Sequence, residues 1–127
     1  MMRRYEWLHN AGMSQATKYG FGYVTPAMAR LFEHMSDGPI TLSELARTLA
    51  ITRQSLQETV AAAIEHGLVA LGRDPDDRRV RILTYTDRGR RMAQLALASD
   101  RRIERNLARR IGEENVEALR RILNLEW

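Results

Sequence analysis

The sequence of 127 residues contains no cysteine and only one lysine, Lys18. Without cysteine the chain can form no disulfide, no thiolate metal site and no thiol redox sensor. No apolar run reaches the ~18 residues that a membrane-spanning helix needs. The charged start "MMRRYEWLHN" also lacks the apolar stretch of a signal peptide. These absences favour a cytoplasmic protein without a membrane partner.

The sequence also lacks the residue groupings of an enzyme or a metalloprotein. His9, His34 and His66 are far apart and have no cysteine or paired carboxylate beside them, so the spacing of a metal site is missing. There is no nucleophile–base pairing and no glycine loop that could cradle a phosphate. We therefore expect no enzymatic activity, no metal and no cofactor.

The formal net charge is +4 and the sequence pI is about 10.1. This excess is compatible with nucleic-acid binding but does not require it. Nearly every basic residue is arginine, whose planar fork suits phosphates and guanine edges. A GC-rich genome that favours arginine would explain the overall bias without any function. The positions of the arginines are therefore more informative than their number.

Residues 24–39, "VTPAMARLFEHMSDGP", predict a helix with both ends marked. Thr25 can cap the helix, Pro26 suits the first helical position, and Gly38 and Pro39 stop it. Apolar side chains recur at helical spacing and predict one buried stripe. The stripe consists of Met28, Leu31, Phe32 and Met35.

Two further helices follow, over residues 41–50 and 52–67. Thr41 and Glu44 have the spacing of a capping box, and Thr52 is the next cap. Two short helices joined by a tight turn predict a helix-turn-helix. In the second helix, the residues predicted to face the core are Leu56, Val60, Ala63 and Ile64. Those predicted to face outward are Gln54, Glu58, Ala61 and Glu65.

Residues 68–73, "LVALGR", and 80–85, "VRILTY", have the composition of short strands. The Asp-Pro turn between them predicts a β-hairpin, and a hairpin directly after a helix-turn-helix is a wing. The sequence thus predicts a mainly α fold with a small β-hairpin wing.

Residues 87–112, with Thr86 as a candidate cap, predict a helix about 37 Å long. A compact globule of this size is only ~36 Å across. Such a helix with a narrow apolar seam favours a partner helix. Helices are also predicted over residues 3–19 and 113–127. We therefore expect a single domain over 1–127, with an N-terminal dimerisation helix (1–24), a winged helix-turn-helix (25–85) and C-terminal dimerisation helices (86–127). The seam residues are Met92, Ala96, Ser99, Ile103 and Leu107.

The segment "TLSELARTLAITRQSLQETVAAAIEHGLVALGRDPDDRRVRILTYTDRGRRM" resembles the multiple antibiotic resistance regulator (MarR) family of bacterial transcription factors. The resemblance covers residues 24–92 best. It implies a homodimer of winged helix-turn-helix units on a near-palindromic operator, often released by a small molecule. The wing carries its most specific part, namely Asp74, Asp77, Arg78, Arg79, Thr86 and Gly89.

A recognition helix places its N-terminal residues against base edges in the major groove. Gln54 and Gln57 suit adenine, Arg53 suits guanine or a phosphate, and Glu58 would have to accept from cytosine N4. Ordinary solvated helix residues are the alternative. The candidate DNA-binding residues of this helix are Thr52, Arg53, Gln54, Ser55, Gln57 and Glu58.

In the wing, Arg78 and Arg79 are predicted to enter a minor groove, where A·T-rich sequence deepens the negative potential. Asp77 is predicted to direct a guanidinium group, that of Arg79 or Arg81. A solvated turn, with ion pairs worth under ~1 kcal/mol, is the alternative. Both readings stay open for Arg81, and the solvated turn is favoured for Arg73.

A pocket for a small aromatic or amphipathic effector is a further expectation from the resemblance. Core and dimer packing is the alternative for the same side chains. The candidate pocket residues are Tyr5, Trp7, Tyr19, Tyr23, Met28 and Met35.

We expect a sequence-specific DNA-binding transcriptional regulator, a repressor, that forms a homodimer with recognition helices ~34 Å apart. Its partners would be double-stranded DNA, a second copy of the chain and the effector. The alternative is a winged-helix module for protein–protein interaction with weak or no DNA binding. Glu58, the alanine run at 61–63 and the modest charge favour that alternative.

Overall fold

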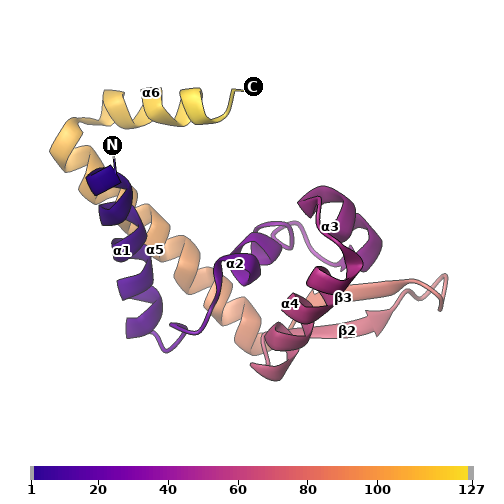
Figure 1. Ribbon diagram of the computed structural model, residues 1–127. Helices are drawn as coiled ribbons and strands as arrows, with labels where there is room; N and C mark the ends of the chain where they lie inside the picture. Colours follow the sequence, from indigo (N-terminus) through magenta and orange to yellow (C-terminus); the bar gives the residue numbers. More distant parts are fainter. Residues whose placement is uncertain (1, 126–127) are drawn as a thin grey trace. The chain divides into compact units, whose positions relative to one another are not determined.

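The computed structural model describes residues 2–125, with the side chains of the first helix described at Trp7 and from Asn10 onward. The helices are α1 (Met2–Lys18), α2 (Pro26–Glu33), α3 (Leu42–Leu49), α4 (Arg53–Glu65), α5 (Asp87–Ile111) and α6 (Glu113–Leu123). The strands are β1 (Ile40–Thr41), β2 (Val69–Arg73) and β3 (Arg81–Tyr85). Figure 1 labels β2 and β3, which form the hairpin. The predicted fold class, mainly helical with a small hairpin wing, is confirmed.

The chain divides into two compact units. The terminal unit combines the N-terminal segment up to Gly22 with the residues from Leu95 onward, and the winged unit spans Tyr23–Gln94. The winged unit thus includes the first two turns of α5, which we had grouped with the C-terminal helices. The single-domain organisation over residues 1–127 stays a prediction.

Each short helix of the winged unit begins at the predicted threonine. The Thr25 hydroxyl accepts from the Met28 N–H at 3.2 Å, and Thr41 and Glu44 form the complete capping box. The backbone N–H and hydroxyl of Thr41 both donate to Glu44, which lowers the pKa of its exposed carboxyl. These caps satisfy backbone N–H groups that would otherwise lack partners.

The sheet of the winged unit has three antiparallel strands in the order β1-β3-β2. The register pairs Val69 with Tyr85 and Arg73 with Arg81. Strand β1, at Ile40–Thr41, pairs with β3 and was not predicted. A two-residue strand is too short to show the alternation by which strands are recognised in a sequence.

The core of the winged unit joins the three helices to the hairpin. The predicted stripe of α2 is buried throughout, and in α4 the predicted inward residues Leu56, Val60 and Ala63 are buried. Ile64 was predicted to face the core, and this was wrong, since its side chain is 40% exposed. It lies at the margin of the apolar stripe, just before the helix ends. The fully buried large side chains are Leu31, Met35, Leu45, Leu68 and Leu83.

Tyr85 ties the end of the hairpin to α2. Its hydroxyl donates to the carbonyl oxygen of Phe32 at 3.1 Å, and the two rings lie 5.9 Å apart between centroids. Burial raises the pKa of Tyr85 to about 12, because the phenolate would lose its hydration. The phenol therefore stays a hydrogen-bond donor throughout the neutral range.

Thr86 and Gly89 join the hairpin to α5. The Thr86 hydroxyl donates to the Gly67 carbonyl at 2.6 Å and accepts from the Gly89 N–H at 3.0 Å, which confirms Thr86 as the helix cap. A Cβ on Gly89 would overlap the Leu68 carbonyl oxygen and come within 2.8 Å of the Tyr85 ring. Only glycine lets the backbone of α5 approach the start of β2 this closely.

In the terminal unit, α5 carries the predicted seam only in part. Ser99 is buried, Ile103 and Leu107 are half-buried, and Ala96 is exposed. Helix α6 ends at Leu123 rather than at Trp127, which lies outside the described residues. Several large apolar side chains of this unit are exposed in the single chain. They include Leu97, Leu119, Ile122, Leu123 and Leu125.

We expect Gly89→Ala to destabilise the protein by about 1–3 kcal/mol, because the added methyl group overlaps backbone atoms that cannot move aside. Urea denaturation followed by circular dichroism measures the change. Gly12→Ala is the matched control, since nothing lies within 4 Å of its Cβ. There, an alanine in a helix should be neutral or stabilise by up to ~1 kcal/mol. Equal midpoints for Gly89→Ala and the unsubstituted chain would contradict the close approach.

Candidate nucleic-acid interface

Helix α4 is held with its N-terminal end exposed. Thr52 caps it, accepting from the Ser55 N–H at 3.1 Å, and the helix packs against β2. Ala50 precedes the cap in the left-handed conformation, with φ 51°. This conformation turns the chain sharply from α3 into α4. The helix-turn-helix is therefore formed as predicted.

All six predicted recognition-helix residues are exposed in the structure. Gln54 Nε2 lies 3.4 Å from Glu58 Oε1, one helical turn away. The amide group of Gln54 is thereby directed along the helix, and it retains an N–H donor and a carbonyl acceptor. The Thr52 and Ser55 hydroxyls bond to each other at 3.1 Å. The first turns of α4 thus present a polar, solvated surface without a strong charge of either sign.

The tip of the wing is shaped by side chains that bond to its own backbone. Asp74 Oδ1 accepts from the N–H groups of Asp76 at 2.7 Å and Asp77 at 3.3 Å. The turn closes where the Asp74 N–H donates to the Val80 carbonyl at 3.0 Å. These bonds fix a tight turn. The backbone that carries Arg78 and Arg79 therefore has a defined conformation.

Asp77 acts on this backbone as well. It was predicted to direct the guanidinium group of Arg79 or Arg81, and this was wrong. Its Oδ1 accepts instead from the backbone N–H of Arg79 at 3.0 Å. Among the described side chains, the salt bridges join Arg90 with Asp87 and Arg120 with Glu104 and Glu117, and none involves the wing. Asp77 therefore orders the turn without holding an arginine side chain.

The wing presents more arginines than the candidate set contained. Arg78, Arg79 and Arg81 are exposed as predicted, and Arg73 is exposed directly opposite Arg81 in the register. Side chains of directly opposed residues point to the same face of a sheet. Arg73 was assigned to a solvated turn because its spacing in the sequence does not reveal its cross-strand neighbour. A register counted from the turn could have indicated it.

The surfaces of α4 and of the wing belong to one compact unit. The hairpin extends beyond the helices of the winged unit, and its tip carries the arginines (Figure 1). A helix with an exposed polar N-terminal end and a protruding hairpin that carries arginines are elements of the kind that bind nucleic-acid grooves in known complexes.

The candidate effector-pocket residues fall into both units. Met28 and Met35 are buried in the core of the winged unit, at 3% and 2% exposed. Tyr23 stacks on His66 with centroids 3.9 Å apart and accepts from Arg88 at 3.1 Å. In the terminal unit, Trp7 is half-buried beneath the Arg110 guanidinium, 4.9 Å from its ring centroid.

The two remaining tyrosines of that set belong to α1 and its end. Tyr19 is 42% exposed, with the Lys18 ammonium 5.8 Å from its ring centroid. The side chain of Tyr5 lies outside the described residues. The effector pocket as a whole stays a prediction.

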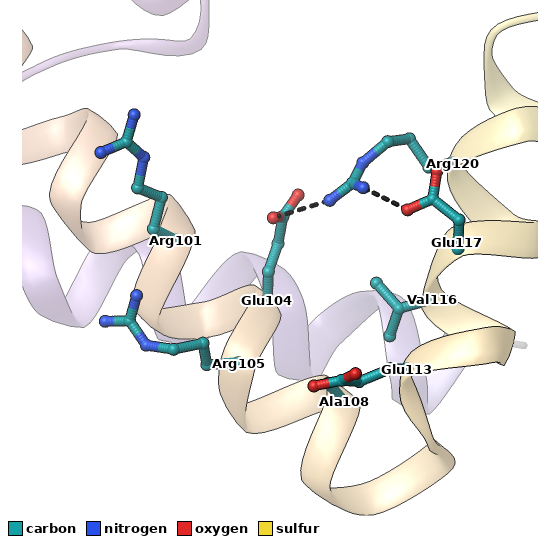
Figure 2. A pocket seen from close by; sticks show the side chains of 8 residues that line it. All are labelled: Arg101, Glu104, Arg105, Ala108, Glu113, Val116, Glu117 and Arg120. Carbon is teal, nitrogen blue, oxygen red and sulfur yellow. Dashed lines mark hydrogen bonds and ion pairs between the residues drawn. The ribbon is translucent and has the colours of Figure 1, made fainter.

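A cavity of about 330 Å³ lies between α5 and α6 of the terminal unit. Figure 2 shows Arg120 reaching from α6 to Glu104 of α5, at 3.0 Å, and to Glu117 of α6. Arg101 and Arg105 lie on the other side of Glu104 (Figure 2). None of its lining residues belongs to the candidate effector set.

Among the described residues, no three histidine or acidic side chains gather so that they could hold a metal ion. Within the same part of the chain, no helix is both long and apolar enough to cross a membrane.

Comparison with known proteins bears on residues 24–80, which match the model of the MarR family. The resemblance stated from the sequence is thereby confirmed over the helix-turn-helix and most of the wing.

Curated relatives match over part of their length. The uncharacterized protein Rv2011c from Mycobacterium tuberculosis is 36% identical over 70 residues, which are 55% of this chain and 49% of the relative. The uncharacterized protein Mb2034c from Mycobacterium bovis matches to the same extent. The chain thus spans about half the length of the curated relatives it matches.

Solved structures match over nearly the whole chain. RV1404 from Mycobacterium tuberculosis has a TM-score of 0.79 at 20% identity, covering 96% of this chain and 84% of that one. MarR has a TM-score of 0.71 at 22% identity, covering 96% and 90%. The heme sensor PefR from Streptococcus agalactiae, in complex with heme, has a TM-score of 0.72 at 16% identity, covering 96% and 85%. At these identities the likeness shows the fold.

Proposed function

We propose that this chain, whose residues 24–80 match the model of the MarR family, is a sequence-specific DNA-binding transcriptional repressor. It acts as a homodimer on a near-palindromic operator. The observation that carries this proposal is the wing, where exposed Arg73 and Arg81 end the two strands and exposed Arg78 and Arg79 lie in the turn between them. The aspartates of this turn bond to backbone N–H groups.

In this proposal α4 enters the major groove with its first turns. Arg53 contacts guanine or a phosphate, and Gln54 and Gln57 read adenine through their paired amide donor and acceptor. Thr52 and Ser55 lie at the capped end, where backbone N–H groups favour a phosphate. Glu58 accepts from cytosine N4, which is the base-edge donor that a carboxylate can use.

The wing enters the neighbouring minor groove with Arg78 and Arg79. An A·T-rich minor groove is narrow and strongly negative, so an arginine inserted there reads the shape of the duplex. Each phosphate that an arginine neutralises also releases counterions, which makes the affinity depend on salt.

The homodimer is supported by the apolar side chains that the terminal unit exposes. Ile122 is 60%, Leu123 63% and Leu125 64% exposed in the single chain. Leucine and isoleucine side chains clustered on one short segment favour burial against another protein surface. A second copy of the chain offers the same surface, as a two-fold symmetric contact requires.

A second candidate function is a winged-helix module that binds a protein. The exposed Ile64 on α4 and the alanine run beside Glu58 favour it, since this part of α4 offers few hydrogen-bond groups to bases. The arginines of the wing favour DNA, and the salt dependence of duplex binding separates the two functions.

A small aromatic or amphipathic effector that releases the operator completes the proposal. It is supported by the resemblance and by the aromatic residues Trp7, Tyr19 and Tyr23, which are half-buried or exposed. PefR, which shares the fold, binds heme.

We expect the purified protein to bind an A·T-tract duplex more tightly than a G·C-rich duplex of equal length. The Arg78→Ala/Arg79→Ala variant should lose this preference, and its dependence of log K on log salt should fall by about 0.9 for each phosphate contact removed. Fluorescence anisotropy at several salt concentrations measures both quantities. Arg102→Ala, exposed on α5, is the control and should bind as the unsubstituted chain does. If the double variant keeps both the preference for the A·T-tract duplex and the salt slope, Arg78 and Arg79 do not bind the minor groove.

We expect the Ile122→Glu/Leu123→Glu variant to sediment as a monomer where the unsubstituted chain sediments as a dimer. Both side chains are exposed in the single chain, so the helix content by circular dichroism should stay the same. The exposed Arg121, changed to Gln, serves as the control on the same helix. Sedimentation of the unsubstituted chain as a monomer would rule out the homodimer.

We expect titration calorimetry with phenolic ligands to show binding heat, and the same ligands to release the protein from its duplex. Tyr23→Ala should weaken both effects, because the tyrosine ring would form part of the wall. A panel of ligands that gives neither heat nor release would remove the effector from the proposal.

A further inference from the structure

The Arg73–Arg81 pair is the last strand pair of the hairpin before the turn. The Asp74 N–H donates to the Val80 carbonyl at 3.0 Å, so residues 74 and 80 form a hydrogen-bonded pair. The two kinds of pair alternate along an antiparallel ladder. Arg73 and Arg81 are therefore a non-hydrogen-bonded pair, with Cα atoms about 4.5 Å apart and the side chains at their closest.

The pair lies on the face of the hairpin that covers the core. Side chains on one face of a strand alternate, and Val69 and Leu83 are buried on the same face as this pair. Both arginines are exposed, because the hairpin has by then extended beyond the core. The two guanidinium groups thus emerge together on the side of the hairpin that carries the helices.

No described side chain forms a salt bridge with either arginine of this pair. The nearby carboxylates of Asp74 and Asp77 accept from backbone N–H groups. None of the salt bridges among the described residues includes either arginine. Like charges directly opposite each other across two strands destabilise a hairpin. Such a pair becomes favourable when an anion lies between the two groups.

We propose that Arg73 and Arg81 form a clamp for one phosphate group of the duplex backbone, separate from the groove-reading arginines at the tip. The inference rests on the proposed DNA binding and names a further contact of that interface. Arginine forks donate in pairs to phosphate oxygens, and two forks on adjacent strands can hold one phosphate from two sides. The clamp positions the wing on the backbone and carries no sequence information.

A duplex phosphate is the occupant that the position favours. The pair is one rung from the tip arginines that the proposal places in the minor groove, and each minor groove is flanked by the phosphates of both strands. A free phosphate ion has the same chemistry, and the experiment below separates these two sources.

The test compares the full chain with Arg73→Gln/Arg81→Gln in duplex titrations between 50 and 200 mM salt. One phosphate per clamp should reduce the slope of log K against log salt by about 0.9, or about 1.8 for a dimer. Between 50 and 200 mM salt, a dimer of the unsubstituted chain should therefore lose about twelve times more affinity than a dimer of the variant does. The loss should be equal on an A·T-tract and on a G·C-rich duplex. The Arg73→Lys/Arg81→Lys variant keeps both charges and should retain the salt slope.

The thermal midpoint of the free protein separates a clamp from a structural role. Removing a like-charge pair should leave the midpoint unchanged or raise it, whereas residues kept for the fold would lower it. An unchanged salt slope, or a reduced slope with a lower midpoint, overturns the clamp. Arg102→Gln should change neither quantity.

If the unsubstituted chain binds no duplex at 50 mM salt, the proposed function fails, and the clamp is judged with inorganic phosphate alone. A midpoint that phosphate raises in the unsubstituted chain but not in Arg73→Gln/Arg81→Gln would show an anion site for free phosphate, and would overturn the duplex as its occupant. Equal midpoints in both proteins would remove the site altogether.

Discussion

The register of β2 against β3 is the constraint on which the proposed interface depends. At one end the register is held by the burial of Val69 and Leu83 and by the hydrogen bond from the Thr86 hydroxyl to the Gly67 carbonyl. At the other end it is set by the turn that Asp74 closes. A slip of one residue would turn every side chain of the moving strand to the opposite face. It would expose Leu83 and separate Arg81 from Arg73, so the core and the basic surface are specified together.

The helices of the winged unit are held to the same hairpin by direct contacts. Gly89 brings the first turn of α5 against the backbone at Leu68, and Tyr85 holds α2 through the Phe32 carbonyl. Helix α4 packs on β2. The orientation of α4 relative to the wing is therefore fixed by contacts within one compact unit, so the proposed interface would be pre-organised. Pre-organisation of this kind reduces the cost of binding.

Local signals in the sequence predicted most of this unit. The caps at Thr25, Thr41 and Thr52 depend on residues three positions apart, and the apolar stripes depend on one helical turn. Such features form from neighbouring residues, and the structure has them where they were predicted. Ile64 was misplaced because periodicity gives the direction of a stripe but not its width. Strand β1 was missed because two residues show no period.

The rest of the site depends on contacts that spacing does not determine. Asp77 stands two residues from Arg79 and four from Arg81, which fits a side-chain ion pair as well as a bond to the backbone N–H. In the turn as it is folded, the Asp77 carboxylate accepts from the backbone N–H of Arg79 and not from an arginine side chain. Arg73 was assigned to solvent because its neighbour, Arg81, is eight positions away and meets it only through the register.

Selection of genomic fragments by the purified protein tests whether two copies of α4 and its wing read a duplex. We expect recovery of one near-palindromic site whose half-sites are centred about 10 base pairs, or ~34 Å, apart. A·T-rich sequence should lie where the wings meet the minor groove. Selection that enriches no sequence, although the protein is folded and dimeric, would show that the chain is no sequence-specific DNA-binding protein and would assign the wing to a protein partner.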